Sequence, residues 1–174
     1  MDGTKQAFRL DKIISGGQTG ADQGGLYAAR ELGIPTGGVA PRGWQTEEGP
    51  QPDLLRGFGL RECSEPGYPA RTRDNVFASD GTLLVGQYQS GGSALTHKIA
   101  MQAANPIFHL EFPPADQVPE YIRQSDPRFE EFRHWLLRHR VRTMNVAGNR
   151  ESQSRGIQEF TREFIIAALS TWSR

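Results

Sequence analysis

Two pairs of adjacent glycines stand where residue type and spacing suit the binding of a phosphate group. Gly16 and Gly17 follow an apolar run and precede a helical pattern, and Gly91 and Gly92 repeat that arrangement. A strand that ends in a glycine turn at a helix N-terminus presents unpaired backbone N–H groups and the positive end of the helix dipole. The first segment, Gly16-Gly17-x-x-Gly20, is neither the spaced-glycine dinucleotide fingerprint nor a Walker A loop. The residues therefore leave two possibilities open, which are anion binding and close packing of a strand on a helix.

Arginines and asparagines elsewhere in the chain have the chemistry to complete such a site. Arg71, Arg73 and Arg150 suit phosphate oxygens because a guanidinium group presents a fork of donors. Each of them is also an ordinary surface residue when it is considered singly. Asn75 and Asn149 suit the polar edge of a heterocycle, and they suit helix caps and turns equally well.

The carboxylates and histidines do not form a recognisable catalytic pattern. Asp22 follows Thr19 by three residues, which favours a capping box with Thr19 as the N-cap, and a contact to a ligand hydroxyl is the second possibility. Glu151 is a candidate general base, but no partner for it is evident. No Gly-x-Ser-x-Gly elbow occurs. Zinc-like spacing is also missing among the four histidines, His97, His109, His134 and His139. The chain favours binding over catalysis, and no metal site is predicted.

Composition narrows the class of partner. The chain of 174 residues has 20 Lys+Arg and 20 Asp+Glu, so no overall field attracts nucleic acid or an anionic membrane. The single cysteine, Cys63, excludes an internal disulfide and fits a reducing compartment. Residues 1–9 contain no apolar signal region, and no apolar run is long enough to span a bilayer. We therefore expect a cytoplasmic protein that binds neither nucleic acid nor membrane.

Alternating strand and helix patterns position the candidate loops. The expected strands lie near residues 13–15, 37–40, 60–63, 81–85, 106–110 and 142–147, and the expected helices near 19–32, 69–80 (capped by Thr72), 93–105, 126–137 and 157–172. This alternation predicts one α/β domain, residues 1–174, with a mostly parallel sheet covered on both faces. Within it, residues 1–9 are expected to be loosely ordered and the Gly/Pro-rich region 37–69 to face a ligand. Because ligands bind outside the carboxyl ends of such strands, the loops 16–20, 86–92 and 148–152 should meet at that edge.

Four segments together resemble the molybdenum cofactor carrier family, over nearly the whole chain. They are residues 16–22 (GGQTGAD), 71–76 (RTRDNV), 79–83 (SDGTL) and 145–152 (NVAGNRES). That family belongs to a Rossmann-like group with the lysine decarboxylase-like phosphoribohydrolases and several nucleotide sensors. The resemblance implies a single-domain Rossmann-like three-layer α/β/α fold, a homo-oligomer (dimer or tetramer), and molybdenum cofactor bound at the strand ends. A carrier of this type shields its cargo from oxidation and performs no chemistry.

Two stretches depart from the patterns of these families. Asn149 stands where the carrier family is expected to have a proline. The phosphoribohydrolases carry a Pro-Gly-Gly-x-Gly-Thr-x-x-Glu loop whose glutamate is catalytic. The matching stretch here, residues 90–98 (SGGSALTHK), lacks the second glycine-threonine pair and the glutamate. This difference disfavours a hydrolase.

We therefore expect a non-catalytic binder of molybdenum cofactor or of a similar phosphorylated pterin or purine. The alternatives are a nucleoside-monophosphate phosphoribohydrolase and a nucleotide-signal sensor, for which the ligand is a nucleotide. The residues expected to bind the cofactor are Gly16, Gly17, Gln18, Thr19, Asp22, Arg71, Arg73, Asn75, Ser90, Gly91, Gly92, Ser93, Asn149, Arg150 and Glu151.

Overall fold

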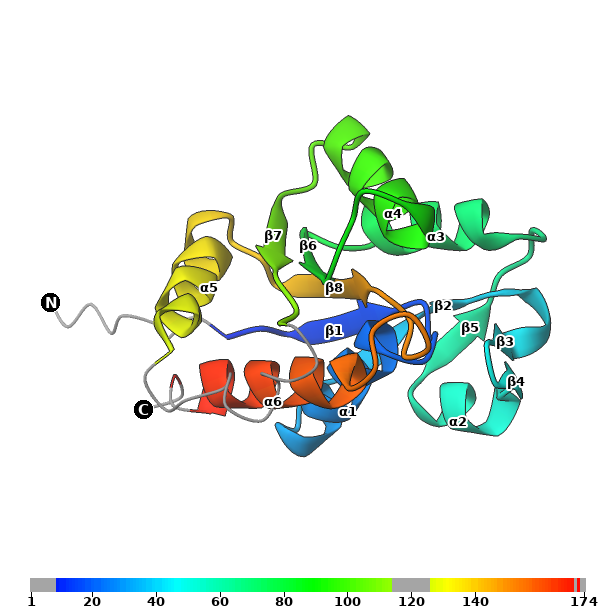
Figure 1. The fold of residues 1–174 in the computed structure, drawn as a ribbon, viewed down its shortest axis with the longest axis horizontal. Helices are drawn as coiled ribbons and strands as arrows, with labels where there is room; N and C mark the ends of the chain where they lie inside the picture. The colour runs from blue at the N-terminus through cyan, green and yellow to red at the C-terminus, as the bar shows by residue number, and fades with distance from the viewer. Residues whose placement is uncertain (1–8, 114–125, 171, 173–174) are drawn as a thin grey trace, which may run out of the picture.

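A parallel sheet of six strands forms the centre of the molecule (Figure 1). The computed structural model describes residues 9–113, 126–170 and 172. The strands lie in the order β5-β2-β1-β8-β6-β7, and every pairing in this sheet is parallel. Their bounds are β1 Lys12–Ser15, β2 Thr36–Ala40, β5 Leu60–Glu62, β6 Gly81–Val85, β7 Ile107–Leu110 and β8 Thr143–Gly148. The mostly parallel α/β fold predicted from the sequence is confirmed.

Helices cover both faces of the sheet, as a three-layer Rossmann-like domain requires (Figure 1). Helices α1 and α6 pack on one face, with α5 against α6, and α3 and α4 pack together on the opposite face. The short helix α2 lies beside the edge strand β5. The helix bounds are α1 Ala21–Glu31, α2 Pro52–Gly57, α3 Tyr68–Phe77, α4 Gly91–Gln102, α5 Pro127–Arg138 and α6 Ile157–Ser170. Among the described residues, no helix has both the length and the apolar character that a membrane span requires.

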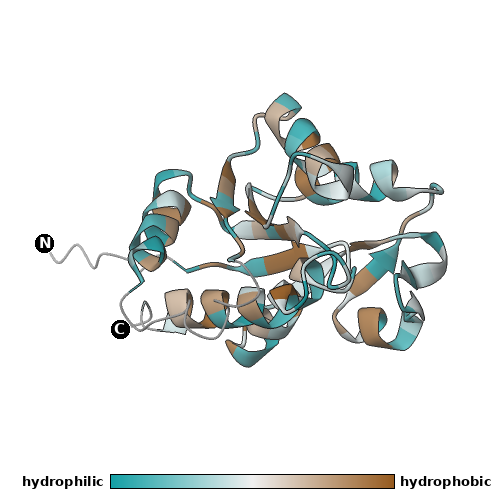
Figure 2. Ribbon diagram, viewed as in Figure 1, coloured by the Kyte–Doolittle hydropathy of each residue, from teal (hydrophilic) through white to brown (hydrophobic). Residues whose placement is uncertain are grey.

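The main core lies between the sheet and the layer of α1, α5 and α6. Its centre consists of fully buried aromatic residues from α5 and α6, such as Phe132, Phe160 and Phe164, against Leu83 and Val146 of the sheet. Apolar residues concentrate on the central strands and on the inward side of α6 (Figure 2). The i, i+3, i+4, i+7 pattern predicted this stripe of α6, because residues at that spacing share one face of a helix.

The strand order shows how the chain winds through the sheet. If β8 is counted first, the strands β1, β2 and β5 follow outward to one edge, and β6 and β7 follow outward to the other. This is the doubly wound arrangement, whose crevice opens beyond the carboxyl ends of the strands where the winding reverses. The loops after β1, β8 and β6 flank that point.

Several helix ends differ from the sequence prediction. Helix α1 has Gly20 as its N-cap, with φ 93°, and no side chain caps it, so Thr19 is not the cap. Helix α3 starts at Tyr68 behind Gly67, with φ 89°, which places Thr72 inside the helix. Glycines at positive φ turn the chain sharply into these helices, so the hydroxyl caps are not needed. Helix α4 starts at Gly91, two residues earlier than expected.

The region 37–69 contains more regular structure than its glycines and prolines indicate. The 3₁₀ turn η1 (Arg42–Trp44) precedes a small antiparallel pair, β3 (Gln45–Thr46) and β4 (Gly49–Pro50), and then α2. Trp44 is buried against the apolar side chains of α2 and β5. Asp126, where the sequence predicts a helix to begin, caps α5, because it accepts a hydrogen bond from the backbone N–H of Arg128 at 2.9 Å.

Candidate ligand-binding cleft

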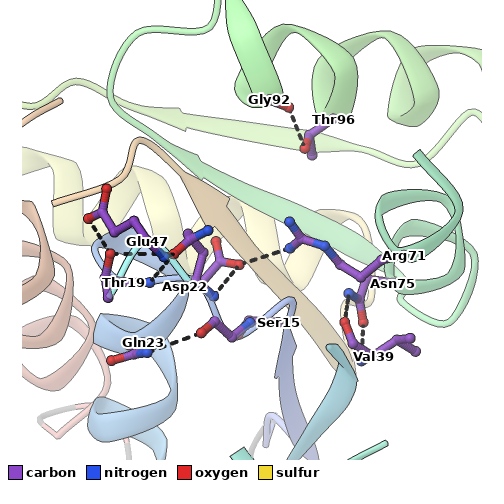
Figure 3. A network of polar contacts seen from close by, with 12 residues as sticks. Ser15, Thr19, Asp22, Gln23, Val39, Glu47, Arg71, Asn75, Gly92 and Thr96 are labelled. Carbon is purple, nitrogen blue, oxygen red and sulfur yellow. Dashed lines mark hydrogen bonds and ion pairs between the residues drawn. The ribbon is translucent and has the colours of Figure 1, made fainter. Parts of the chain in front are cut away.

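A cleft of about 290 Å³ opens at the carboxyl edge of the sheet. It is lined by the loop after β1, the start of α4 after β6, and the loop after β8, so the predicted meeting of these three loops is confirmed. Helix α3 supplies the opposite wall. Figure 3 shows several of these elements from close by. The lining residues are Gln18, Asp22, Tyr68, Pro69, Arg71, Thr72, Gly91, Gly92, Leu95, Thr96, Ala147, Gly148 and Arg150.

The backbone amides of the loop after β1 are already used inside the chain. The N–H of Gly17 donates to the Ser15 hydroxyl at 3.1 Å, and the N–H of Gln18 donates to Asp22 Oδ2 at 3.3 Å. The N–H of Gly20 donates to the side-chain oxygen of Gln158 at 3.1 Å. The carboxylate of Asp22 thus takes the place at the start of α1 that an anionic ligand would take. The backbone amides of this loop are therefore not available to a phosphate group.

Close packing explains both glycines of this loop. A Cβ atom at Gly16 would lie 1.4 Å from Nη1 of Arg71, so the guanidinium group lies directly on this residue. A side chain at Gly17, where φ is 76°, would meet Leu55 at 2.7 Å and Leu60 at 3.0 Å. Of the two possibilities that the sequence left open, close packing therefore describes Gly16 and Gly17, and anion binding does not.

The start of α4 is open where the start of α1 is closed. Ser90 is its N-cap in an extended conformation, and its side chain makes no capping hydrogen bond. Among the hydrogen bonds of the described residues, none takes the backbone N–H of Gly91, Gly92 or Ser93 to an acceptor. Cβ atoms built on Gly91 and Gly92 would meet nothing within 4 Å. A helix of 12 residues therefore directs unpaired N–H groups and its positive dipole end at the cleft.

Two arginines and a tyrosine surround this helix start. Arg71 and Arg150 both line the cleft, and their guanidinium carbons lie 5.5 Å and 5.4 Å from the centre of the Tyr68 ring. Tyr68 is 39% exposed, so its ring is available to a planar molecule. Tyr68 was not among the residues predicted from the sequence. Its signal was the i, i+3 spacing to Arg71, which places both side chains on one face of α3.

A buried ion pair forms the inner end of the cleft. Nη1 of Arg71 lies 3.2 Å from Oδ2 of Asp22, and the two side chains are 13% and 6% exposed (Figure 3). Burial raises the pKa of Asp22 above its ordinary value, and the positive charge of Arg71 opposes that shift. Asp22 is therefore a partner of Arg71 and of the loop after β1, in addition to lining the cleft.

Glu47 ties the loop after β1 to the loop after β8. Its carboxylate accepts hydrogen bonds from the Thr19 hydroxyl, from the Ser152 hydroxyl and, at 3.1 Å, from the Ser152 backbone N–H. Burial opposes the charged form, but the hydrogen bonds from Ser152 and Thr19 and the charge of Arg150 outweigh it and lower the pKa of Glu47. Its bonds are non-local, so no local pattern indicated them.

Arg73 and Asn75 of α3 lie away from the cleft lining. Arg73 is exposed and pairs with Glu65 at 3.5 Å. Asn75 is buried, where its amide donates to the carbonyl of Val39 at 3.0 Å and accepts from the N–H of Val39 at 2.9 Å (Figure 3). Asn75 is therefore neither a residue of the cleft lining nor a helix cap or turn residue, because it lies inside α3 and joins that helix to β2.

Three further predicted residues, Asn149, Ser93 and Glu151, form hydrogen bonds within the chain and are not among the lining residues of the cleft. The Asn149 amide accepts from the N–H of Gln87 at 2.7 Å and donates to its carbonyl at 2.9 Å, which joins the loops after β8 and β6. Ser93 is buried beside Asn149, 3.4 Å from its amide nitrogen. Glu151 accepts from the N–H groups of Gly156 at 2.5 Å and Gln158 at 3.0 Å, so it caps the start of α6. The structure therefore brings Gln18, Asp22, Arg71, Gly91, Gly92 and Arg150 together around the cleft.

A larger hollow of about 840 Å³ lies between the loops after β6, β7 and β8. Amide side chains such as Gln87, Gln89 and Gln153 line much of it, and it extends to Pro113. It contains neither an open helix start nor a pair of arginines among its described lining residues. The smaller cleft is therefore the candidate site for an anion.

The fold and the cleft define a doubly wound α/β protein with a small-molecule site at the switch point of its sheet. The model of the circularly permutated YpsA SLOG family matches residues 13–169, and the chain belongs to this family. A crystal structure of a protein from Syntrophus aciditrophicus SB, named "putative molybdenum carrier protein", is similar to the chain. It shares 35% sequence identity over 92% of this chain and 95% of that one, with a TM-score of 0.79. No curated protein matches the chain.

The strand order agrees with the word "permutated" in the family description. Counting from β8 restores a continuous winding order, and β1 begins at the side of the molecule where α6 ends (Figure 1). Joining those ends and opening the chain before β8 would thus produce an ordinary doubly wound sheet. These findings confirm the resemblance that the four sequence segments indicated.

Proposed function

We propose that this protein binds and carries a phosphorylated heterocycle of the molybdenum cofactor type, without converting it. The observation that carries the proposal is the open start of α4, whose free N–H groups line the same cleft as Arg71 and Arg150. Phosphate oxygens accept from helix N-termini and from guanidinium forks, and both donor types converge here. The similarity to a protein named as a molybdenum carrier supports the pterin form of the ligand.

In the proposed complex each wall of the cleft has a separate task. The amides of Gly91 and Gly92 hold the phosphate, and Arg150 neutralises its charge, whereas Arg71 is paired with Asp22. The exposed ring of Tyr68 provides a flat surface for the heterocycle. Thr96, whose hydroxyl donates to the carbonyl of Gly92 at 3.1 Å, supports the first turn of α4.

Three observations favour carriage over hydrolysis of a nucleotide. Residues 90–98 lack the glutamate that the phosphoribohydrolases use, and the candidate base Glu151 is engaged at the start of α6. Asp22, the acid among the described lining residues of the cleft, is paired with Arg71. A nucleotide-signal sensor remains the second candidate, because the same amides and arginines suit any nucleoside phosphate.

The test begins with protein purified from its own host. Native mass spectrometry and elemental analysis should find a bound mass that contains molybdenum and phosphorus. A retained adenine nucleotide would contradict the carrier and favour the sensor. Release of a free base from a panel of nucleoside monophosphates would contradict the non-catalytic assignment.

The variant Gly92→Ala tests whether the start of α4 binds the phosphate. Its Cβ enters open space at the cleft wall, so the fold should be retained or slightly stabilised, while retention of the phosphorylated ligand falls about tenfold. Gly57→Ala is the control, because it also adds a methyl group to a helix, with its nearest neighbour 4.0 Å away and outside the cleft. Equal ligand retention in both variants would remove α4 from the proposed site.

A further inference from the structure

Two buried N–H groups beside the cleft have no acceptor among the described residues. They are Nε2 of Gln18 and Nε of Arg71. Both side chains line the cleft, and they are largely buried, with Gln18 5% and the Arg71 side chain 13% exposed. Buried donors are nearly always paired in native proteins, so two unpaired donors at one cavity indicate a partner that the chain itself does not supply.

Hydrogen bonds to its oxygen fix the orientation of the Gln18 amide. Oε1 accepts from the backbone N–H of Thr19 at 3.0 Å and from that of Glu47 at 2.8 Å. Rotation of the amide would bring its NH₂ group against these two donors. The nitrogen of Gln18 is therefore held as a donor.

The carboxylate of Asp22 holds Arg71 beside Gln18. Asp22 Oδ2 accepts from Nη1 of Arg71 at 3.2 Å and from the backbone N–H of Gln18 at 3.3 Å. The inner end of the cleft therefore combines two unpaired donors with a buried acid. A small side-chain shift of the kind common on ligand binding presents either donor to a molecule in the cleft.

From this pattern we propose that the inner end of the cleft selects a heterocycle by an oxo group and the ring N–H beside it. This inference rests on the proposed function and specifies the base or pterin edge of its ligand. The oxo oxygen accepts from Gln18 and Arg71, and the adjacent ring N–H faces Asp22. A 4-oxopterin and a 6-oxopurine share this edge.

An amino-substituted ring presents the reverse pattern. Its NH₂ group faces the donors of Gln18 and Arg71, and its bare ring nitrogen faces the carboxyl group of Asp22. A site built from buried donors discriminates strongly against such an analogue, because the buried polar groups of the site are left unpaired when the analogue binds. Adenine and diaminopteridines are therefore disfavoured.

The experiment uses two pairs of probes that differ in this edge. Inosine monophosphate is compared with adenosine monophosphate, and pterin with 2,4-diaminopteridine, by calorimetric titration of the ligand-free protein. The oxo member of at least one pair should bind about tenfold more tightly than its amino counterpart. The pair that binds distinguishes a purine ligand from a pterin ligand.

Two variants assign the preference to the named donors. Gln18→Glu keeps the Oε1 acceptor and replaces the donor by an acceptor, so the preference for the oxo member should disappear. Arg71→Lys keeps a cation for Asp22 without the Nε donor and should reduce the preference. Gln153→Glu, the same change at an exposed position outside the cleft, should leave it unchanged. If Gln18→Glu does not fold, the unmodified protein still decides.

The outcomes separate this inference from the proposed function. Equal or reversed affinity within both pairs, or no binding by either pair, overturns the oxo preference. If inorganic phosphate still binds and is lost in Gly92→Ala, the anion site survives that result. If phosphate does not bind at all, the proposed function fails as well.

Discussion

At the scale of single residues, buried amides and carboxylates in this protein replace missing backbone partners. Strand β2 pairs with β1 only as far as Gly37, and at Gly38 the chain has φ 126° close to Ser15. The side chain of Asn75 supplies the donor and the acceptor that Val39 then needs. Asp22 acts similarly at the start of α1, where its carboxylate accepts a hydrogen bond from the backbone N–H of Gln18. Both residues thus set the shape of the strand ends that border the cleft.

Asn75→Ala should destabilise the protein without a direct effect on the ligand. The change leaves the N–H and C=O of Val39 buried and unpaired, which costs about 3 kcal/mol in free energy of unfolding. Urea unfolding at neutral pH measures the loss. Arg73→Ala, on the exposed side of the same helix, is the control and should change the free energy by less than about 0.5 kcal/mol. Equal losses in both variants would mean that the Asn75 bonds contribute nothing.

At the scale of elements, the cleft depends on side chains that join one strand-end loop to another. Glu47, just after β3, bonds to Thr19 of the loop after β1 and to Ser152 of the loop after β8. Asn149 joins the loop after β8 to Gln87 of the loop after β6. These bonds hold the three loops in one arrangement, although each loop follows a different strand.

The bridge made by Glu47 predicts a specific pH dependence of stability. Its folded-state pKa is lowered below the ordinary 4.5, so the folded state holds this proton more weakly than the unfolded state. The stabilisation is therefore complete above about pH 4.5 and is lost as the pH falls through the lowered pKa. Glu47→Gln should cost up to about 1 kcal/mol at pH 7, a small value because the residue is exposed.

Urea unfolding of the unmodified protein and of Glu47→Gln at pH 7 and at pH 3 measures this difference. The difference between the two proteins should be smaller at the lower pH, because the charge of Glu47 is lost as the pH falls through its lowered pKa. Glu48→Gln, the neighbouring exposed acid, is the control. A constant difference at both values of pH would contradict a charged role for Glu47.

At the scale of the whole molecule, the layer of α3 and α4 has an exposed apolar surface. Among the described residues, four large hydrophobic side chains are exposed, and two of them, Phe77 and Met101, lie in this layer outside the cleft lining. Phe77 ends α3 and Met101 lies near the end of α4, and Asn105 joins those two ends through hydrogen bonds to Val76 and Ser79. Exposed apolar patches of this kind mark surfaces that associate with other proteins.

We therefore propose that the expected homo-oligomer assembles through this surface. The double variant Phe77→Glu and Met101→Glu should reduce the molar mass measured by light scattering to that of one chain, because it places charges where apolar contacts are needed. The side chains are 67% and 63% exposed, so the monomer should remain folded. Leu137→Glu, an exposed apolar residue on α5, is the control and should not change the mass. A monomeric unmodified protein would contradict the proposal.

Much of the element order follows from local patterns. The apolar run Gly81–Val85 matches β6, the Asp126-Pro127 pair marks the start of α5, and the spacing of apolar residues marks α6. Helix starts were less predictable. Thr19 and Thr72 have the residue type of caps, yet glycines at positive φ make the turns instead. A hydroxyl group that could cap a helix can also bond to any other partner that the folded chain brings near. The Thr19 hydroxyl donates to Glu47 instead of capping α1.

The sequence by itself determined the alternation of strands and helices, the edge at which the three loops gather, and the family resemblance, because these depend on local residue types and their spacing. Only the tertiary structure decided which donors are free. The start of α1 is filled by Asp22 and covered by Arg71, whereas the start of α4 is open, although both carry paired glycines. Whether a backbone N–H is available depends on which distant side chain lies over it, and the packing of the whole chain sets that.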